Sequence, residues 1–195
     1  MYQKTLIVKY VRCIMKPNRK KLDNAIPSIL SAPKNDAQIE QLCYRPEFGE
    51  RNFVDMLPVS VNGGVQGCRW SHTPWLKKKD GSGDPRIQVS ILQKRVLDLV
   101  YVPGDDEIHP GDTFIVDMDL SHDNLPIGSV IQAGSALLRV SDHWNNACVK
   151  WKVRYGSDAL DWVRQDENIK FRLRGVLCEI IKDGTIINGE LLQKV

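Results

Sequence analysis

The chain has 195 residues, of which 42% are apolar and 26% are charged, and its formal net charge is +3. These values are typical of a globular protein that buries its own core, and they exclude a fibrous or largely disordered chain. No apolar run approaches the roughly 18 residues that cross a bilayer, and no secretory signal is visible, so we expect a cytoplasmic protein with no membrane partner.

The positive charge is concentrated in the first 22 residues. They contain seven lysines and arginines and no acid, so the rest of the chain carries a net charge of −4. Such an arm favours nucleic-acid binding when aromatic residues are interleaved with the cations, and here only Tyr2 and Tyr10 are available. We therefore expect a strand over residues 5–15 and a solvated lysine-rich loop, with nucleic acid not the expected partner.

Residues 16–46 have weak periodicity and contain four prolines. They are predicted to form a loop with one short helix over residues 36–43, capped by Asn35 or Asp36. The pattern becomes β-like from Phe53 onward. Val59-Ser60-Val61 meets Asn62-Gly63, a dipeptide that accepts the positive φ angles of a tight hairpin turn.

The rest of the chain predicts short strands with two helices between them. Over residues 87–91, Ile87, Val89 and Ile91 alternate with Gln88 and Ser90, which is typical of a half-buried strand. Another strand is indicated where Phe114, Val116 and Met118 alternate with Ile115, Asp117 and Asp119. Further strands are expected at 130–131 and 136–140, and a hairpin over 176–187 that turns at Asp183-Gly184. One helix is expected at 93–100, and another is expected after Ser157, burying Leu160, Trp162 and Val163.

These elements predict a mainly β fold, a partly closed barrel or a sandwich, with two or three short helices. We expect a single domain over residues 1–195. It comprises a basic segment (1–22), a poorly defined loop or helix insertion (23–52) and a β-rich region (53–195).

Five cysteines lie at positions 13, 43, 68, 148 and 178. Their number is odd and no C-x-x-C pair occurs, which favours reduced thiols over disulfides. The sequence contains no G-x-S-x-G, Walker, G-x-G-x-x-G or H-E-x-x-H motif. Cys68 and His72 have a spacing that would ligate zinc from a helix, but Gly67, Ser71 and Pro74 disfavour a helix there.

Several short stretches occur in an order and spacing that together resemble a known family. They are Gly63-Gly64-Val65-Gln66-Gly67, residues 86–92, the block 119–141 with Leu125-Pro126-Ile127-Gly128, the dipeptide Ala147-Cys148, Arg174-Gly175-Val176, and Ile187-Asn188-Gly189-Glu190. Over about two thirds of the chain this pattern resembles a MOSC domain, the C-terminal domain of molybdenum-cofactor sulfurases. The family's usual Pro-Cys dipeptide is Ala147-Cys148 here, and its Gly-Glu-Asn segment is Gly111-Asp112-Thr113.

The resemblance implies a β-rich barrel in which Cys148 carries sulfur or coordinates the molybdenum of a pterin cofactor, molybdopterin. A thiolate is a soft ligand that suits both roles. Cations would assist an anionic cofactor, and Lys150, Arg69, Arg86 and Arg154 are the candidates. Gly64 and Gly67 would let the backbone approach the ligand. The family also has an association with pyridoxal phosphate.

We expect the site at one mouth of the barrel, where Cys148 meets the glycine turn 63–67 and the polar loop 70–84. Because no flavin or nicotinamide fingerprint occurs, a sulfur donor or redox proteins are the expected partners. The sequence leaves open whether the protein is an enzyme. The alternatives are a non-enzymatic binding module with this fold and a weak nucleic-acid binder that uses the basic N-terminus.

Overall fold

The computed structural model describes residues 16–101 and 109–195, and these form short strands and short helices. In chain order the elements are α1 (Arg19–Leu30), β1 (Ala37–Tyr44), β2 (Asn52–Val54), β3 (Met56–Ser60), β4 (Gly64–Val65), 3₁₀ turns at Arg69–Ser71 and Pro85–Ile87, β5 (Val89–Gln93), α2 (Lys94–Val100), β6 (Phe114–Val116), β7 (Val130–Ala133), β8 (Ala136–Val140), α3 (Val149–Tyr155), α4 (Ser157–Arg164), α5 (Asp166–Ile169), β9 (Val176–Lys182), β10 (Gly184–Ile187) and β11 (Leu191–Lys194).

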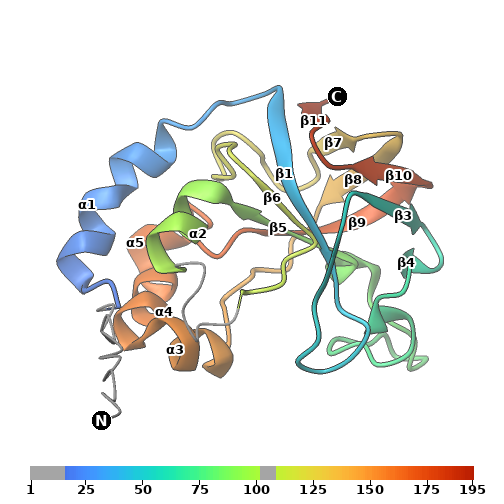
Figure 1. The fold of residues 1–195 in the computed structure, drawn as a ribbon, viewed down its shortest axis with the longest axis horizontal. Coiled ribbons are helices and arrows are strands. Elements are labelled where there is room, and N and C mark those ends of the chain that lie inside the picture. The colour runs from blue at the N-terminus through green and yellow to red at the C-terminus, as the bar shows by residue number, and fades with distance from the viewer. Residues whose placement is uncertain (1–15, 102–108) are drawn as a thin grey trace, which may run out of the picture.

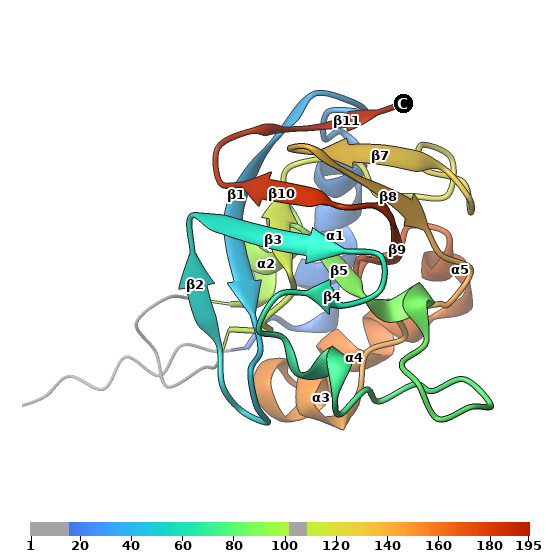
Figure 2. The same cartoon turned by 90° about the vertical axis from the view of Figure 1, so that its right-hand side faces the viewer.

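Seven of these strands form a closed barrel (Figures 1 and 2). Their order is β11-β7-β8-β9-β5-β6-β1, and β11 returns to β1 through the pairs Ala37 with Leu192 and Gln38 with Leu191. Strands β5 and β6 run parallel, and the other pairs are antiparallel. Strands β10, β3 and β4 form a separate small sheet. The predicted mainly β fold with a barrel and short helices is confirmed, and the barrel is closed.

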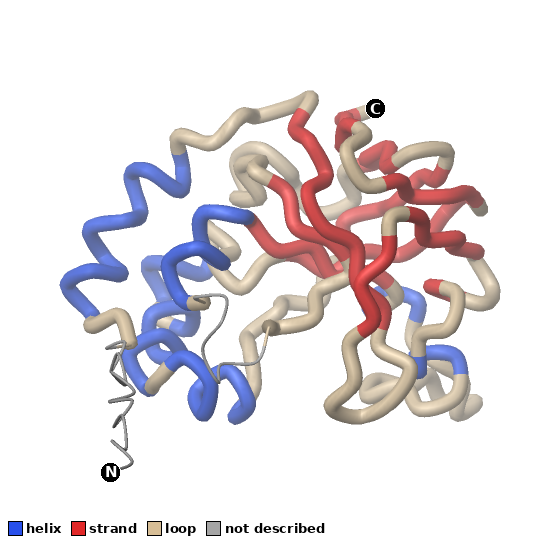
Figure 3. The backbone as a smooth tube through the Cα atoms, viewed as in Figure 1, coloured by secondary structure: helices blue, strands red, loops and turns tan. Residues whose placement is uncertain are grey.

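The helices gather on one side of the barrel (Figures 1 and 3). They create a second apolar layer, because Leu92 of β5 and Ile115 of β6 point outward and pack against buried residues of the helices, including Val96 and Trp162. The inward-facing residues of the same strands, such as Ile91, fill the barrel interior. Strand β5 is therefore buried on both faces, which corrects the half-buried strand predicted over residues 87–91.

The predicted helix over residues 36–43 is wrong, because these residues form strand β1. The strand pairing has an irregularity between Ile39 and Gln41. A bulge interrupts the two-residue alternation of a strand, and the buried residues Ile39, Leu42 and Cys43 consequently have helix-like spacing. The real helix of this region is α1, which the prolines concealed. It contains Pro27 and buries Leu22 and Ile29.

The two predicted hairpin turns have different outcomes. Strands β3 and β4 do form a hairpin around residues 61–63, with Ser60 opposite Gly64, and the positive φ angle of +71° falls on Gly64. The hairpin at Asp183-Gly184 is wrong, because β9 pairs with β5 and β8 whereas β10 pairs with β3. Gly184 is needed for a different reason, since a Cβ there would lie 2.5 Å from the backbone nitrogen of Ala136.

The other elements expected within residues 16–101 and 109–195 are confirmed. Strands lie at 114–116, 130–133 and 136–140, and helix α2 buries Val96, Leu97 and Val100. Helix α4 buries Leu160, Trp162 and Val163, with Ser157 as its first residue and Gly156 as its cap. The strand predicted over residues 5–15 lies outside the described residues. No helix in residues 16–101 and 109–195 is long and apolar enough to cross a membrane.

Candidate functional site

A cavity of about 460 Å³ opens at one end of the barrel. Its walls come from the stretch after β1, the N-terminal part of β5, the loops before β6 and β9, the loop after β8, and helix α3. These segments meet because antiparallel pairing brings the end of β1 beside the start of β6, and the end of β8 beside the start of β9. The volume is in the range of roughly 300–1,000 Å³ that holds small organic ligands.

Cys148 lies on the wall of this cavity and is exposed, whereas Cys43, Cys68 and Cys178 are buried. It is the cap residue of helix α3 and has extended backbone angles. Its loop is held from two sides. The Asn145 side chain donates to the Arg174 carbonyl at 3.0 Å, and Arg164 donates to the carbonyl oxygens of Asn146 and Ala147 at 2.8 and 3.3 Å. The thiol is thus accessible and carried by an anchored segment.

Ala147 has a φ angle of +59°, in the left-handed region that residues other than glycine rarely adopt. Proline fixes φ near −65°. The backbone at this position is therefore incompatible with the Pro-Cys dipeptide that the resembled family usually has. Backbone strain of this kind is common where a reactive side chain must be aimed.

Basic side chains dominate the cavity wall. It is lined by Arg45, Arg51, Arg69, Lys150, Arg154 and Arg174, and by the acids Glu47, Glu50 and Asp112. Only Arg174 of the six cations makes an ion pair within the described residues. Burial lowers the pKa of Arg51, and the charge of Arg154 lowers it further. Burial and Arg45 likewise lower the pKa of Arg69. The cations thus repel one another, which an anionic ligand would relieve.

Arg174 and Asp112 form a buried ion pair at the cavity. The Arg174 guanidinium lies 2.8 Å from a carboxylate oxygen of Asp112, and their side chains are 13% and 1% exposed. The same guanidinium lies over the Trp151 ring, 4.7 Å from its centroid. These contacts fix Arg174 in position and neutralise it, so the net positive charge of the cavity comes from the other cations.

A glycine lets two of those arginines approach the loop before β6. Gly111 has a φ angle of +78°, and a Cβ there would lie 2.9 Å from Nε of Arg51 and 3.4 Å from Cδ of Arg45. Next to it, the Gly111 amide donates to Nδ1 of the buried His109 at 3.0 Å. Burial lowers the pKa of His109 to about 4, so this imidazole is neutral at pH 7 and adds no charge.

Aromatic side chains flank the cavity. Phe48 is exposed and lies under the Arg69 guanidinium, 4.1 Å from the ring centroid, with the Lys150 ammonium at 5.4 Å. Trp75 and Trp144 are also exposed and line the cavity. Aromatic faces interleaved with cations bind planar, negatively charged molecules.

The predicted site residues are partly brought together. Cys148, Lys150 and Arg69 line the cavity, as does Arg154. The described lining does not include Arg86, Gly64 or Gly67. Arg86 makes ion pairs with Asp84 at 2.8 Å and Asp142 at 3.2 Å.

The two glycines lie elsewhere for steric reasons. A Cβ at Gly64 would lie 2.6 Å from the Trp70 ring, and one at Gly67 would lie 3.0 Å from the Tyr44 ring. The glycine turn therefore packs against aromatic rings. Of the polar loop 70–84, Trp75 reaches the cavity.

Sequence reasoning missed Arg45, Arg51 and Asp112 as cavity residues and did not assign Arg174 a role. The sequence signal for Arg174 is its position in a stretch that resembles the family. Arg45 and Arg51 lie in the segment 23–52, which is predicted only as a poorly defined loop or helix insertion. The described residues contain no group of three or more histidines, cysteines and acids that would hold a metal ion by themselves.

No protein-family model and no curated protein matches the sequence. Solved structures do match the fold. YuaD from Bacillus subtilis is 21% identical with a TM-score of 0.52, covering 80% of this chain and 93% of that chain. YiiM from Escherichia coli is 16% identical with a TM-score of 0.52, covering 81% and 69%. A structure described as a hypothetical protein is 17% identical with a TM-score of 0.57, covering 82% and 68%.

YuaD and YiiM are MOSC-domain proteins, so these likenesses support a MOSC fold for this chain. At these identities they concern the fold alone. A shared fold does not determine function, which depends on the residues of the cavity.

Proposed function

We propose that this protein is a MOSC protein that binds a molybdenum-pterin cofactor in the cavity, with Cys148 as the ligand of the metal or as a carrier of sulfur. The observation that carries the proposal is one cavity with an exposed thiol and five cations that no described carboxylate pairs with. The likeness to MOSC folds supports it.

The residues present fit such a group in charge and in chemistry. The phosphate and dithiolene of a pterin cofactor are anionic, and Arg45, Arg51, Arg69, Lys150 and Arg154 would hold them by charge-assisted hydrogen bonds. The Phe48, Trp75 and Trp144 rings would cover a planar heterocycle. Bound here, the cofactor would supply a metal centre that exchanges electrons or sulfur.

The role of Cys148 follows from its exposure and its anchored loop. A single thiolate suffices for a metal whose other ligands come from the cofactor. Arg164 and Asn145 hold the loop so that the sulfur stays at the cavity wall. The same exposure suits a persulfide that a sulfur donor must reach. The two roles of the thiol differ in whether molybdenum stays bound when the sulfur is removed.

The experiment measures molybdenum and pterin in protein purified from a host that makes the cofactor. Elemental analysis gives the metal, and the fluorescence of the acid-oxidised pterin gives the organic part. We expect near-stoichiometric amounts of both in the natural protein. Cys148→Ser should retain pterin and lose most of the molybdenum if the thiolate is a ligand, and retain both if Cys148 carries sulfur.

Charge variants provide the matched comparison. Arg45→Gln and Arg154→Gln should each lose at least tenfold in pterin content, whereas Arg139→Gln, whose side chain pairs with Glu179 outside the cavity, should keep it. Circular dichroism checks that each variant is folded. Natural protein without pterin, or cavity variants with undiminished pterin, would rule out the proposed function.

A further inference from the structure

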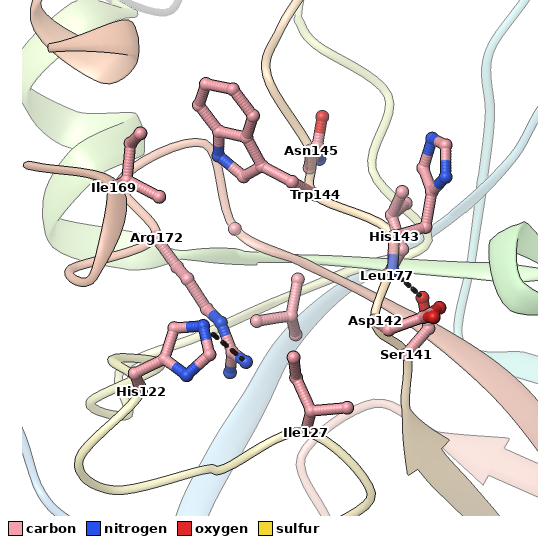
Figure 4. A pocket seen from close by; sticks show the side chains of 12 residues that line it. His122, Ile127, Ser141, Asp142, His143, Trp144, Asn145, Ile169, Arg172 and Leu177 are labelled. Atoms are coloured by element: carbon pink, nitrogen blue, oxygen red, sulfur yellow. Dashed lines mark hydrogen bonds between the residues drawn. The ribbon is translucent and has the colours of Figure 1, made fainter. Parts of the chain in front are cut away.

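A second, smaller pocket lies beside the loop that carries Cys148. Figure 4 shows the side chains that line it. This side pocket has a volume of about 50 Å³ and includes His122, Ile127 and Arg172 in its lining. It shares Trp144, Asn145 and Leu177 with the large cavity, so these residues form the partition between the two.

Arg172 brings a buried positive charge to the side pocket. The residue is 8% exposed. Figure 4 shows its side chain reaching toward the His122 ring, with Nη2 of Arg172 3.4 Å from Nε2 of His122. Its other terminal nitrogen donates to the Leu125 carbonyl oxygen. A guanidinium has five N–H donors, so these contacts leave several of them for the pocket.

No carboxylate within the described residues pairs with Arg172. The acid in the pocket lining is Asp142, and its carboxylate is paired with Arg86 at 3.2 Å. The Cys178 thiol lies close enough to influence Arg172, but burial raises its pKa to about 12, so it is neutral at pH 7. Burial and the Arg172 charge lower the pKa of His122, which therefore is an uncharged neighbour.

An uncompensated buried charge needs an explanation beyond the structural hydrogen bonds. Burying a cation costs several kcal/mol unless a counter-charge or full hydrogen bonding offsets the lost hydration. The hydrogen bond to the Leu125 carbonyl oxygen requires only one donor. A neutral side chain would provide that donor with a smaller desolvation cost. The charge of Arg172 is therefore most simply explained by an anion that enters the side pocket.

The size and walls of the pocket restrict that anion. One ordered water needs about 10–15 Å³ of such volume, so the pocket holds roughly three to five waters or a group of similar size. The side chains of Ile127 and Leu177 are apolar, and Trp144 adds a single donor, its indole N–H. These three walls provide no further donors for a large, highly charged group. A carboxylate matches the fork of a guanidinium with two parallel hydrogen bonds.

We propose that the side pocket is a binding site for a planar anion of carboxylate size, held by the Arg172 guanidinium. The site is separate from the cofactor proposed at Cys148 and does not depend on it. Its ligand is either a free small anion or the carboxylate of a larger molecule that extends past Trp144 into the large cavity.

The test uses formate as the probe, followed by NMR of ¹⁵N-labelled protein. The Nε–H signal of Arg172 and the indole N–H signal of Trp144 are recorded at constant ionic strength, with chloride as the reference salt. We expect both signals to move along a saturable curve with half-saturation in the millimolar range. A shift that is linear in concentration, or equal in formate and chloride, would mean screening only and would overturn the proposal.

Two variants and a control separate binding from general charge effects. Arg172→Lys keeps the charge but lacks the fork, and should weaken formate binding at least tenfold. Ile127→Trp fills the pocket from an exposed position and leaves Arg172 itself unchanged, and should abolish saturation even if the lysine variant folds poorly. Arg139→Lys lies outside the pocket and should bind as the natural protein does. Unchanged binding in Ile127→Trp would end the proposal.

A comparison of carboxylates distinguishes the two sources of the anion. If 3-phenylpropionate binds at least tenfold more tightly than formate and also shifts signals of Arg154 and Lys150, the carboxylate belongs to a molecule that spans both cavities. If formate binds equally well, the ligand is a free small anion. Both results retain the site, and loss of saturation for every carboxylate removes it.

Discussion

The buried pair between Asp112 and Arg174 offers the sharpest test of the cavity's electrostatics. Asp112→Asn keeps the shape of the side chain but leaves the Arg174 guanidinium without its counter-charge. Removing one partner of a buried ion pair costs about 3–5 kcal/mol. We expect the lower end, about 3 kcal/mol, because Arg174 is 13% exposed and keeps its contact with the Trp151 ring.

The assay is urea unfolding at pH 7, with thermal unfolding as a second readout. A loss of about 3 kcal/mol corresponds to a melting temperature lower by about 6–12 °C for a chain of this length. The variant also adds a free cation to the cavity, so inorganic phosphate should bind it more tightly than the natural protein. Phosphate at ten times its Kd should restore about 1.4 kcal/mol of the lost stability.

Asp98→Asn is the matched control. Asp98 pairs with Lys94 on the surface of helix α2, and its side chain is 57% exposed. Such a pair is worth about 0.3–0.5 kcal/mol. If Asp112→Asn lowers the free energy of unfolding by no more than Asp98→Asn does, the reasoning about the buried pair is refuted.

Three further predictions concern single residues. Iodoacetamide should modify Cys148 at least tenfold faster than the buried cysteines of the folded protein, as measured by mass spectrometry of peptides, and equal rates would contradict the exposed thiol. Ala147→Gly should keep the free energy of unfolding within about 0.5 kcal/mol of the natural protein, because glycine accepts the φ of +59°. Ala147→Pro should lower it by about 3 kcal/mol. The reverse order in urea unfolding would refute the strained backbone. Because the pKa of His109 falls from 6.5 to about 4 on folding, the unfolded chain binds more protons than the folded chain between pH 6.5 and pH 4. The free energy of unfolding should therefore drop by up to about 3 kcal/mol as the pH falls through this range. His109→Phe should remove this part of the pH dependence.

The strands after residue 53 were predictable because local patterns carry them. Residues 114–116 and 136–140 are apolar in a regular arrangement, and turn residues separate them from their neighbours. The same reasoning failed at β1, where a bulge between Ile39 and Gln41 disturbs the alternation. It also failed at β10, because hairpin signals do not reveal that a chain leaves one sheet for another.

The thiol of the candidate site was predictable, and most of its surroundings were not. Cys148 stands in a short stretch with a recognisable family context. Arg45 and Arg51 have no local pattern, and only the barrel brings them beside residues about one hundred positions later. The same is true of the side pocket, whose Arg172 meets His122 from another part of the chain.

The closure of the barrel by β11 has a consequence for how the chain folds during synthesis. Strand β1 pairs with residues 191 and 192. One of its edges therefore stays unpaired until a segment more than 150 residues later in the chain has been made. Until then β1 and β7 both expose unpaired backbone groups, which attract other strands. Contacts this distant in sequence slow folding. In the nascent protein this seam should therefore stay open to other strands until β11 has been made, even though the finished barrel is closed there.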